Sequence, residues 1–229
     1  MAHSTLFPAD FVWGAATSAF QIEGSPLADG AGPSNWQAFC HQPGRIVNDD
    51  HGEIACDHYH RYADDVGLMQ QLGIGAYRFS LNWARILPNG RGPLNASGID
   101  FYKRLLDTLE NAGIQSFATL HHWDYPLALD EKGGWQNRDS SAWFADYAAV
   151  LFRQLGDRIT SWATFNEPWV IVHEGFVAGT HPPGLQNLLA ARSATHNILR
   201  GHGMAVQAFR AESKGDIGIV VNLEPKSVS

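Results

Sequence analysis

The strongest constraint on the fold is a repeating unit, in which an amphipathic helix precedes a short apolar strand and a polar residue stands late in that strand or just after it. Arg78, His122 and Asn166 hold this position in three successive units, at intervals of 44 residues. Strands that alternate with helices pair in parallel. Because parallel folds place their active sites where the carboxyl ends of the strands meet, the pattern predicts an α/β fold with one polar site there.

The same unit predicts where the secondary structure lies. Apolar residues at strand or helix spacing, bounded by glycines, indicate five strands and four helices. The strands are expected at residues 11–20, 76–81, 116–120, 161–165 and 217–221. The helices are expected over the apolar stripes at residues 59–69, 99–109 and 144–155, with a fourth over residues 185–212. Asp57 is expected to cap the first helix.

The segment around the first strand separates two kinds of parallel fold. Gly14 and Gly24 are isolated, so no glycine-rich phosphate loop follows this strand. A (β/α) barrel is therefore favoured over a nucleotide-binding sheet. The Pro-, Gly-, Asn- and Asp-rich loop over residues 25–52 is too long to be idle in a compact domain, and such loops are usually functional or disordered.

Composition narrows the class of protein. With 45% hydrophobic and 17% charged residues, the chain can bury a sizeable core. The net charge is −7 and the basic residues are scattered, which argues against nucleic acid or an anionic membrane as a partner. No apolar run approaches the ~20 residues that a membrane helix needs. The eight tryptophans would suit sugars, whose C–H faces stack on indole rings, although tryptophan also fills cores.

Cysteine and histidine usage bears on compartment and cofactors. Cys40 and Cys56 are too few for a disulfide framework, so both are expected as free thiols in a reducing compartment. Residues 1–8 lack the basic and apolar regions of a secretion signal, so a cytoplasmic location is expected. The eleven histidines show no zinc-ligand spacing, and neither a metal nor another cofactor is expected.

The stretch from Ser161 to Trp169 is the strongest candidate for chemistry. Its apolar run, residues 162–165, predicts a buried strand that delivers Asn166 and Glu167 at its end, where Pro168 stops it. A carboxyl group beside apolar rings is poorly solvated, which favours its protonated form and makes it usable as a proton donor near neutral pH. The alternative is an ordinary surface glutamate that caps a helix.

Six short motifs resemble glycoside hydrolase family 1, the β-glucosidase type, and the resemblance runs from Phe11 to Pro225. Each motif is weak alone, but all six stand in the order that the family has. They are Phe11-Val12-Trp13-Gly14-Ala15-Ala16-Thr17, Gln21-Ile22-Glu23-Gly24, Ala55-Cys56-Asp57-His58-Tyr59, Tyr77-Arg78-Phe79-Ser80, His121-His122-Trp123-Asp124-Tyr125-Pro126 and Thr164-Phe165-Asn166-Glu167-Pro168-Trp169.

The resemblance implies a (β/α)8 TIM barrel, of which this chain supplies roughly strands 1–5 with helices 1–4, and a retaining mechanism. Glu167 would be the general acid/base, and Asn166 would donate to the 2-hydroxyl group of the sugar. Gln21, His122 and Trp123 would bind the rest of the substrate, a β-glucoside or oligosaccharide. Arg78 would keep the nucleophile ionised. His121 is expected to be structural, and Glu23 is expected to support the turn after the first strand.

The family's nucleophile is a second glutamate in a Glu-Asn-Gly setting, which does not occur in this sequence. Residues 1–229 are therefore expected to form the N-terminal part of a single barrel domain, active only with a complementary C-terminal half. Two alternatives stay open. One is a 6-phospho-β-glycosidase of the same family, and the other is a non-catalytic sugar-binding or inert half-barrel.

Overall fold

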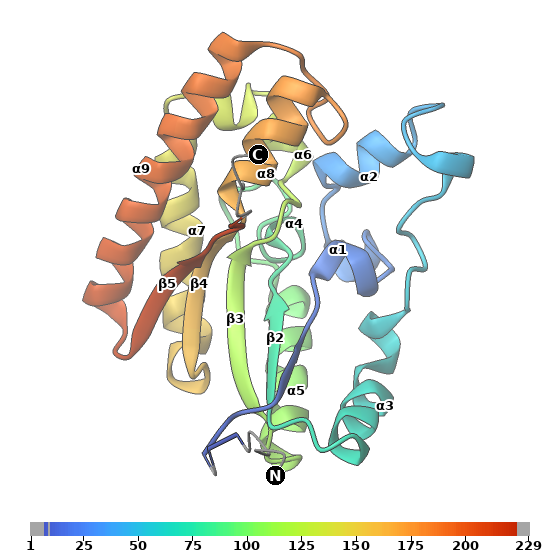
Figure 1. Cartoon of the computed structure of the whole chain (residues 1–229), viewed down its shortest axis with the longest axis vertical. Helices are drawn as coiled ribbons and strands as arrows, with labels where there is room; N and C mark the ends of the chain where they lie inside the picture. Colours follow the sequence, from blue (N-terminus) through green and yellow to red (C-terminus); the bar gives the residue numbers. More distant parts are fainter. Residues whose placement is uncertain (1–6, 9, 224–229) are drawn as a thin grey trace, which may run out of the picture.

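The computed structural model describes residues 7–8 and 10–223, and within them five strands form one parallel sheet. The strands are β1 (Gly14–Ala16), β2 (Ala76–Ser80), β3 (Gln115–His121), β4 (Ser161–Asn166) and β5 (Asp216–Val220). They pair in sequence order, and every pairing is parallel. This open sheet confirms the expectation of a partial barrel (Figure 1).

Four long helices connect the strands and cover one face of the sheet (Figure 1). They are α3 (His58–Gln71), α5 (Ala96–Asn111), α7 (Ser140–Leu155) and α9 (Leu188–Glu212). The shorter α-helices are α1 (Ala19–Ile22), α2 (Asn35–Cys40), α4 (Trp83–Ile86), α6 (Leu127–Asp130) and α8 (Pro168–Val172). Single 3₁₀ turns are η1 (Ala28–Gly30), η2 (Val47–Asp49), η3 (Gly134–Gln136) and η4 (Gly156–Arg158), and η5 (His173–Ala178) is a π-helix.

The first strand is much shorter than predicted, and the prediction of a strand up to Phe20 was wrong. Only residues 14–16 pair with β2, and α1 starts at Ala19, whose backbone N–H donates to Ser80 Oγ at 2.7 Å. Gln21 therefore stands on a helical turn. A strand-like apolar sequence does not reveal this, because the bond that starts the turn comes from a residue 61 positions away.

Two predicted helix starts also differ in detail. Helix α9 begins at Leu188 rather than Leu185, because Asn187 Oδ1 accepts the N–H groups of Leu189 and Ala190. Asp57 does precede α3, but with a φ of 54° it makes no cap bond to the helix backbone. Its carboxylate accepts from His60 Nδ1 at 2.6 Å instead.

Aromatic side chains fill the layer between the sheet and the helices. Trp83 stacks on Tyr147 with ring centres 4.6 Å apart, and Phe144 stacks on Phe165 at 4.4 Å. All four side chains are fully buried. Burying each such side chain contributes about 1.5–3 kcal/mol, so α7 is held firmly against α4 and the end of β4. Among the described residues, no helix is both long and apolar enough to cross a membrane.

The two edge strands of the sheet, β1 and β5, are more exposed than the strands at its centre. All three residues of β1 are exposed, and those of β5 are exposed or half-buried. Next to β1, Phe7, Phe11 and Trp13 form an aromatic cluster with ring centres 4.5–4.7 Å apart, yet each ring is 44–57% exposed. Exposed apolar surface beside an unpaired strand edge favours association with another chain or segment.

We predict that the 229-residue chain, purified by itself, associates through these edges instead of remaining a monomer. Size-exclusion chromatography with light scattering would measure its mass. Trp13→Gln should shift the population toward monomer, because it removes apolar surface at the open edge. Leu72→Gln, at a side chain that is 78% exposed just beyond α3, is the matched control and should change nothing. A monodisperse monomer for the unmodified chain would contradict the prediction.

Candidate active site

The polar residues predicted from the repeating unit do converge at the carboxyl ends of the strands. Arg78 of β2 donates from Nη1 to Asn166 Oδ1, at the end of β4, over 3.1 Å. Trp123, which follows β3, donates from Nε1 to the backbone carbonyl of Asn166 at 3.0 Å. Three consecutive strands thus contribute to one network around Asn166.

Glu167 leaves the end of β4 in a backbone conformation that few non-glycine residues adopt. Its φ and ψ are 50° and 67°, and its N–H donates to the carbonyl of Val220 at 2.8 Å. Pro168 follows as the first residue of α8, where its missing N–H costs nothing. The half-buried side chain makes no capping bond to α8, so the alternative of a simple helix cap has no support in the geometry.

Arg78 is the positive charge closest to these groups. Partial burial lowers the pKa of its guanidinium, and the negative charge of Glu167 offsets part of that effect. Arginine keeps its proton under all ordinary conditions. The site therefore holds a permanent positive charge that a hydrogen bond orients toward Asn166.

His122 lies beside Arg78 and is held neutral. Burial, together with the positive charge of Arg78, lowers its pKa to about 4. Its Nδ1 is buried and has no hydrogen-bond partner within the described residues. A neutral imidazole on the cavity wall suits hydrogen bonding to a hydroxyl group that enters the site.

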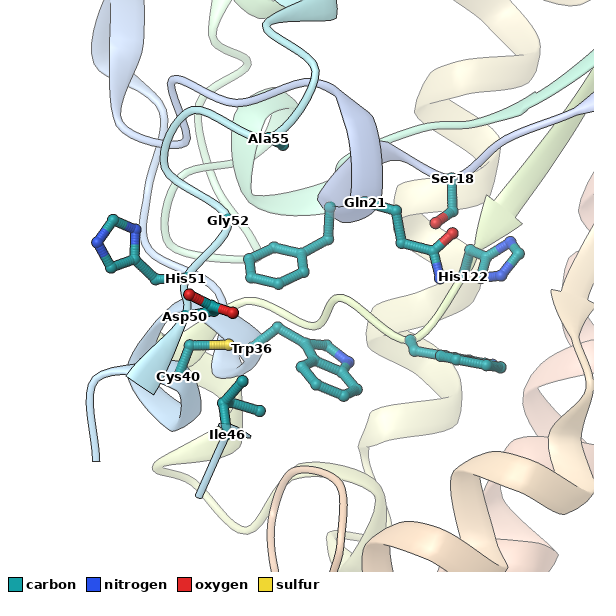
Figure 2. Close-up of a pocket in the computed structure, with 12 residues that line it drawn as sticks. Ser18, Gln21, Trp36, Cys40, Ile46, Asp50, His51, Gly52, Ala55 and His122 are labelled. Atoms are coloured by element: carbon teal, nitrogen blue, oxygen red, sulfur yellow. The ribbon is translucent and has the colours of Figure 1, made fainter. Parts of the chain in front are cut away.

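A cavity of about 340 Å³ opens next to this network (Figure 2). Gln21, His122 and Trp123 line it, and the amide of Gln21 points toward His122 (Figure 2). Asn166, Glu167 and Arg78 are not among its lining residues, and Trp123 connects the two groups through its bond to Asn166. The structure thus brings the six predicted site residues into two adjoining parts of one region.

Several residues that the sequence reasoning did not select also face this region. The long loop supplies Trp36, Cys40, Ile46, Asp50 and His51 to the cavity wall. His181 packs against both Trp36 and Trp123, with ring centres 4.9 and 5.5 Å away. The high tryptophan content indicated an aromatic sugar-binding surface, but no local sequence pattern linked these residues to the strand ends.

Two charged or titratable residues considered in the sequence are structural. Glu23 is buried, and its carboxylate accepts from Arg85 Nε at 3.1 Å and from the Tyr102 hydroxyl at 2.6 Å. His121 is fully buried, and burial lowers its pKa to about 3. Its ring packs among aromatic side chains, Trp135 and Phe165 at 5.4 Å among them.

Nothing in the described part of the chain is arranged as a metal centre. No group of three or more His, Cys, Asp or Glu side chains is placed to hold an ion. Both cysteines are free thiols there, with Cys40 buried and Cys56 exposed. The arrangement can do proton-transfer and hydrogen-bonding chemistry with its own side chains.

At its carboxyl edge, the parallel (β/α) sheet presents a glutamate, an asparagine, an arginine and a histidine beside a tryptophan-lined cavity. This combination is typical of carbohydrate-active barrel enzymes. The sequence matches the family model "Glycosyl hydrolase family 1" over residues 3–228. The chain belongs to this family.

Named relatives give the same result. The chain is 52% identical to Beta-glucosidase A of Thermotoga maritima over 225 residues, which cover 96% of this chain and 50% of the relative. It is 50% identical to a 1,4-beta-D-glucan glucohydrolase of Thermotoga neapolitana, covering 96% of this chain and 53% of that protein. A solved structure of the Thermotoga maritima β-glucosidase with castanospermine superposes with a TM-score of 0.94, over 96% of this chain and 51% of that one. The chain spans about half the length of the relatives it matches.

We predict that proton uptake by His121 and His122 lowers the unfolding free energy as the pH decreases from about 6.5 to 4. Since their folded-state pKa values are about 3 and about 4, each imidazole binds a proton more readily in the unfolded chain across that window. The raised pKa values of the carboxyl groups of Asp124 and Asp130 act in the opposite direction, so the test compares a histidine variant with the unmodified chain.

The backbone N–H of Trp123 donates to His121 Nδ1 at 3.3 Å, and His121→Asn keeps a possible acceptor for it. In urea unfolding, this variant should lose less stability than the unmodified chain as the pH decreases. The exposed His196→Asn is the control. An unchanged pH slope in His121→Asn would contradict the prediction.

Proposed function

We propose that this chain is the acid/base half of a retaining β-glucosidase that hydrolyses terminal β-D-glucosyl residues by double displacement. The observation that carries the proposal is the placement of Glu167 at the end of β4, beside Asn166 and the Arg78 guanidinium. The β-glucosidases and the glucan glucohydrolase to which the chain is similar support this substrate class.

Glu167 would give its proton to the glycosidic oxygen as the bond to the leaving group breaks, and would later take a proton from the attacking water. Its fixed backbone places the carboxyl group at the end of a buried strand and outside any capping bond. Pre-organised placement of this kind lowers the entropic part of the barrier.

Asn166 is oriented for a single task. Its Oδ1 accepts from Arg78, so the amide orientation that satisfies this bond leaves the two N–H groups of Nδ2 as the donors of this side chain. They would donate to the 2-hydroxyl group, a contact that strengthens in the transition state of glycoside hydrolysis. Arg78 would act through Asn166 in addition to supporting an ionised nucleophile.

The remaining sugar contacts would come from the cavity wall. His122 offers a neutral imidazole at the cavity wall, and Gln21 offers an exposed amide that points toward it (Figure 2). Trp123 offers an indole face for the C–H side of a pyranose ring. No cofactor is needed for these steps.

Retaining catalysis needs a second carboxylate ~5–5.5 Å from the acid/base. Glu23 is a poor candidate because Arg85 and Tyr102 already bind its two oxygens. We therefore infer that the nucleophile belongs to the part of the relatives that this chain does not span, whether in the same polypeptide or in a complementary chain. A cytoplasmic location is proposed from the two free thiols.

Both alternatives from the sequence can be separated by experiment. A 6-phospho-β-glycosidase would turn over an aryl 6-phospho-β-glucoside and leave the plain glucoside intact. An inert half-barrel would show no turnover with either substrate, even when the complementary half is supplied. The proposed enzyme hydrolyses the plain β-glucoside once complete.

Glu167→Gln in the complete enzyme should reduce hydrolysis of an alkyl β-glucoside far more than cleavage of an activated aryl β-glucoside. The alkyl leaving group needs a proton and the activated aryl group hardly does, while acid/base assistance is worth ~10²–10⁴-fold. Burst kinetics and steady-state rates on both substrates measure this, with Glu131→Gln, at an exposed residue just after α6, as the control. Equal loss on both substrates would remove Glu167 from the role.

Asn166→Ala should lower kcat/KM mainly through kcat. The contact to the 2-hydroxyl group tightens in the transition state, so its loss affects the barrier more than ground-state binding. Gln21→Ala, at the far side of the cavity, should mainly relax discrimination between sugars that differ at remote hydroxyl groups. An Asn166→Ala enzyme with unchanged kcat and a raised KM would contradict the assignment.

A further inference from the structure

A second cavity lies in the outer helical layer and shares no lining residue with the sugar-binding region. Its volume is about 450 Å³, and it opens between η3, the segment that leads into α7, and the first turns of α9. The side chains that rim it are Gln136, Arg138, Leu189, Arg192, Ser193 and His196.

This outer groove carries uncompensated positive charge. Within the described residues, Arg138 and Arg192 have no carboxylate within 4.0 Å, and no acidic residue lines the groove. His196 adds a third positive charge when protonated. Four other arginines do form ion pairs, namely Arg85, Arg91, Arg153 and Arg158. Although the net charge of the chain is −7, this groove is lined only by cationic and neutral groups.

The walls of the groove are fixed by hydrogen bonds and do not depend on a ligand. The buried Asn197, at the floor, donates from Nδ2 to the carbonyls of Trp135 and Asn137 at 2.8 and 3.1 Å. Arg200 Nη1 donates to the carbonyl of Arg138 at 3.2 Å and adds its own charge nearby. The backbone that carries Arg138 is therefore anchored to α9, and the two arginines face a preformed space.

The attraction of this groove for an anion comes from its arginine side chains and not from the N-terminus of α9. The first N–H groups of α9 are already accepted by Asn187, its cap residue. The guanidinium groups, by contrast, have free donors arranged as planar forks, which match the oxygens of a phosphate group. Leu189, which is 72% exposed, adds an apolar surface next to them.

We propose that this groove binds the phosphate group of a small organic molecule, with Arg138 and Arg192 as the main contacts. The volume is within the range of small-molecule sites, ~300–1,000 Å³. Gln136 and His196 provide further polar contacts, and Leu189 packs against the organic part of the ligand. The site is independent of the glucosidase chemistry, because none of its residues belongs to the strand-end network.

Isothermal titration of the purified protein with inorganic phosphate and with glycerol phosphate tests the proposal. Both ligands should bind one site saturably, and glycerol phosphate should bind more tightly because it also contacts Leu189. Arg138→Gln and Arg192→Gln should each weaken binding about tenfold, the effect of one charge-assisted hydrogen bond. Arg210→Gln, an exposed arginine further along α9, is the matched control and should leave binding unchanged.

Three outcomes would overturn the proposal. The first is the absence of saturable binding, and the second is equal weakening by Arg210→Gln, which would indicate a diffuse effect of charge. The third concerns the source of the phosphate group: flotation with vesicles of phosphatidylcholine and phosphatidic acid would reveal a lipid-headgroup site. Vesicle binding that the two groove variants abolish, without binding of glycerol phosphate, would exclude a small-molecule site.

Discussion

The hydrogen bond from Arg78 to Asn166 connects two strands that are not neighbours in the sheet. Arg78 lies in β2 and Asn166 ends β4, so the bond passes over the end of β3. It forms because equivalent units of the chain bring their polar residues to the same edge, as parallel pairing requires. It orients the Asn166 amide and holds the Arg78 guanidinium at the strand ends, where Arg78 interacts with the charge of Glu167.

Two residues at this edge hold strained backbones. Trp123 has a φ of 80° and Glu167 a φ of 50°, and each directly follows or nearly follows the end of a strand. Such conformations cost on the order of 1–3 kcal/mol and persist only where surrounding bonds enforce them. Here the Trp123 indole is bonded to the Asn166 carbonyl, and the Glu167 N–H to Val220 of β5. These backbone conformations interrupt the alternation of side chains between the two faces of the sheet, and they direct both side chains toward the site.

The sequence predicted the fold well where periodicity decides the structure. Strands β2, β3 and β4 and the helices between them lie within four residues of the predicted positions, since their apolar faces and terminal glycines are local signals. The first strand was overestimated because its second half is set by a distant partner, Ser80. Likewise, no local pattern pairs Arg85 with Glu23, or His181 with Trp36, because these contacts arise only from folding.

The candidate site residues divide in the same way, into those with a local sequence signal and those whose contacts arise only from folding. Arg78, His122 and Asn166 could be found from their equal spacing, and Glu167 from its place after Asn166. The long loop could be marked as functional by its length, but the residues it sends to the cavity could not be named. Trp36, Cys40 and Ile46 have no feature that separates them from core residues, since an apolar side chain serves a core and a cavity wall equally well.

Burial sets which groups near the site carry charge. It lowers the pKa of His122, and it raises that of Asp124 well above the usual range, since Asp124 is fully buried. Both are thereby favoured in their neutral forms, which leaves Arg78 as the fixed positive charge beside Glu167. In the proposed enzyme, a carboxylate brought next to Arg78 would be stabilised as the anion without competition from a protonated histidine. The same guanidinium that orients Asn166 would then also keep the nucleophile ready to attack, which makes Arg78 the residue through which the two halves of the mechanism are coupled.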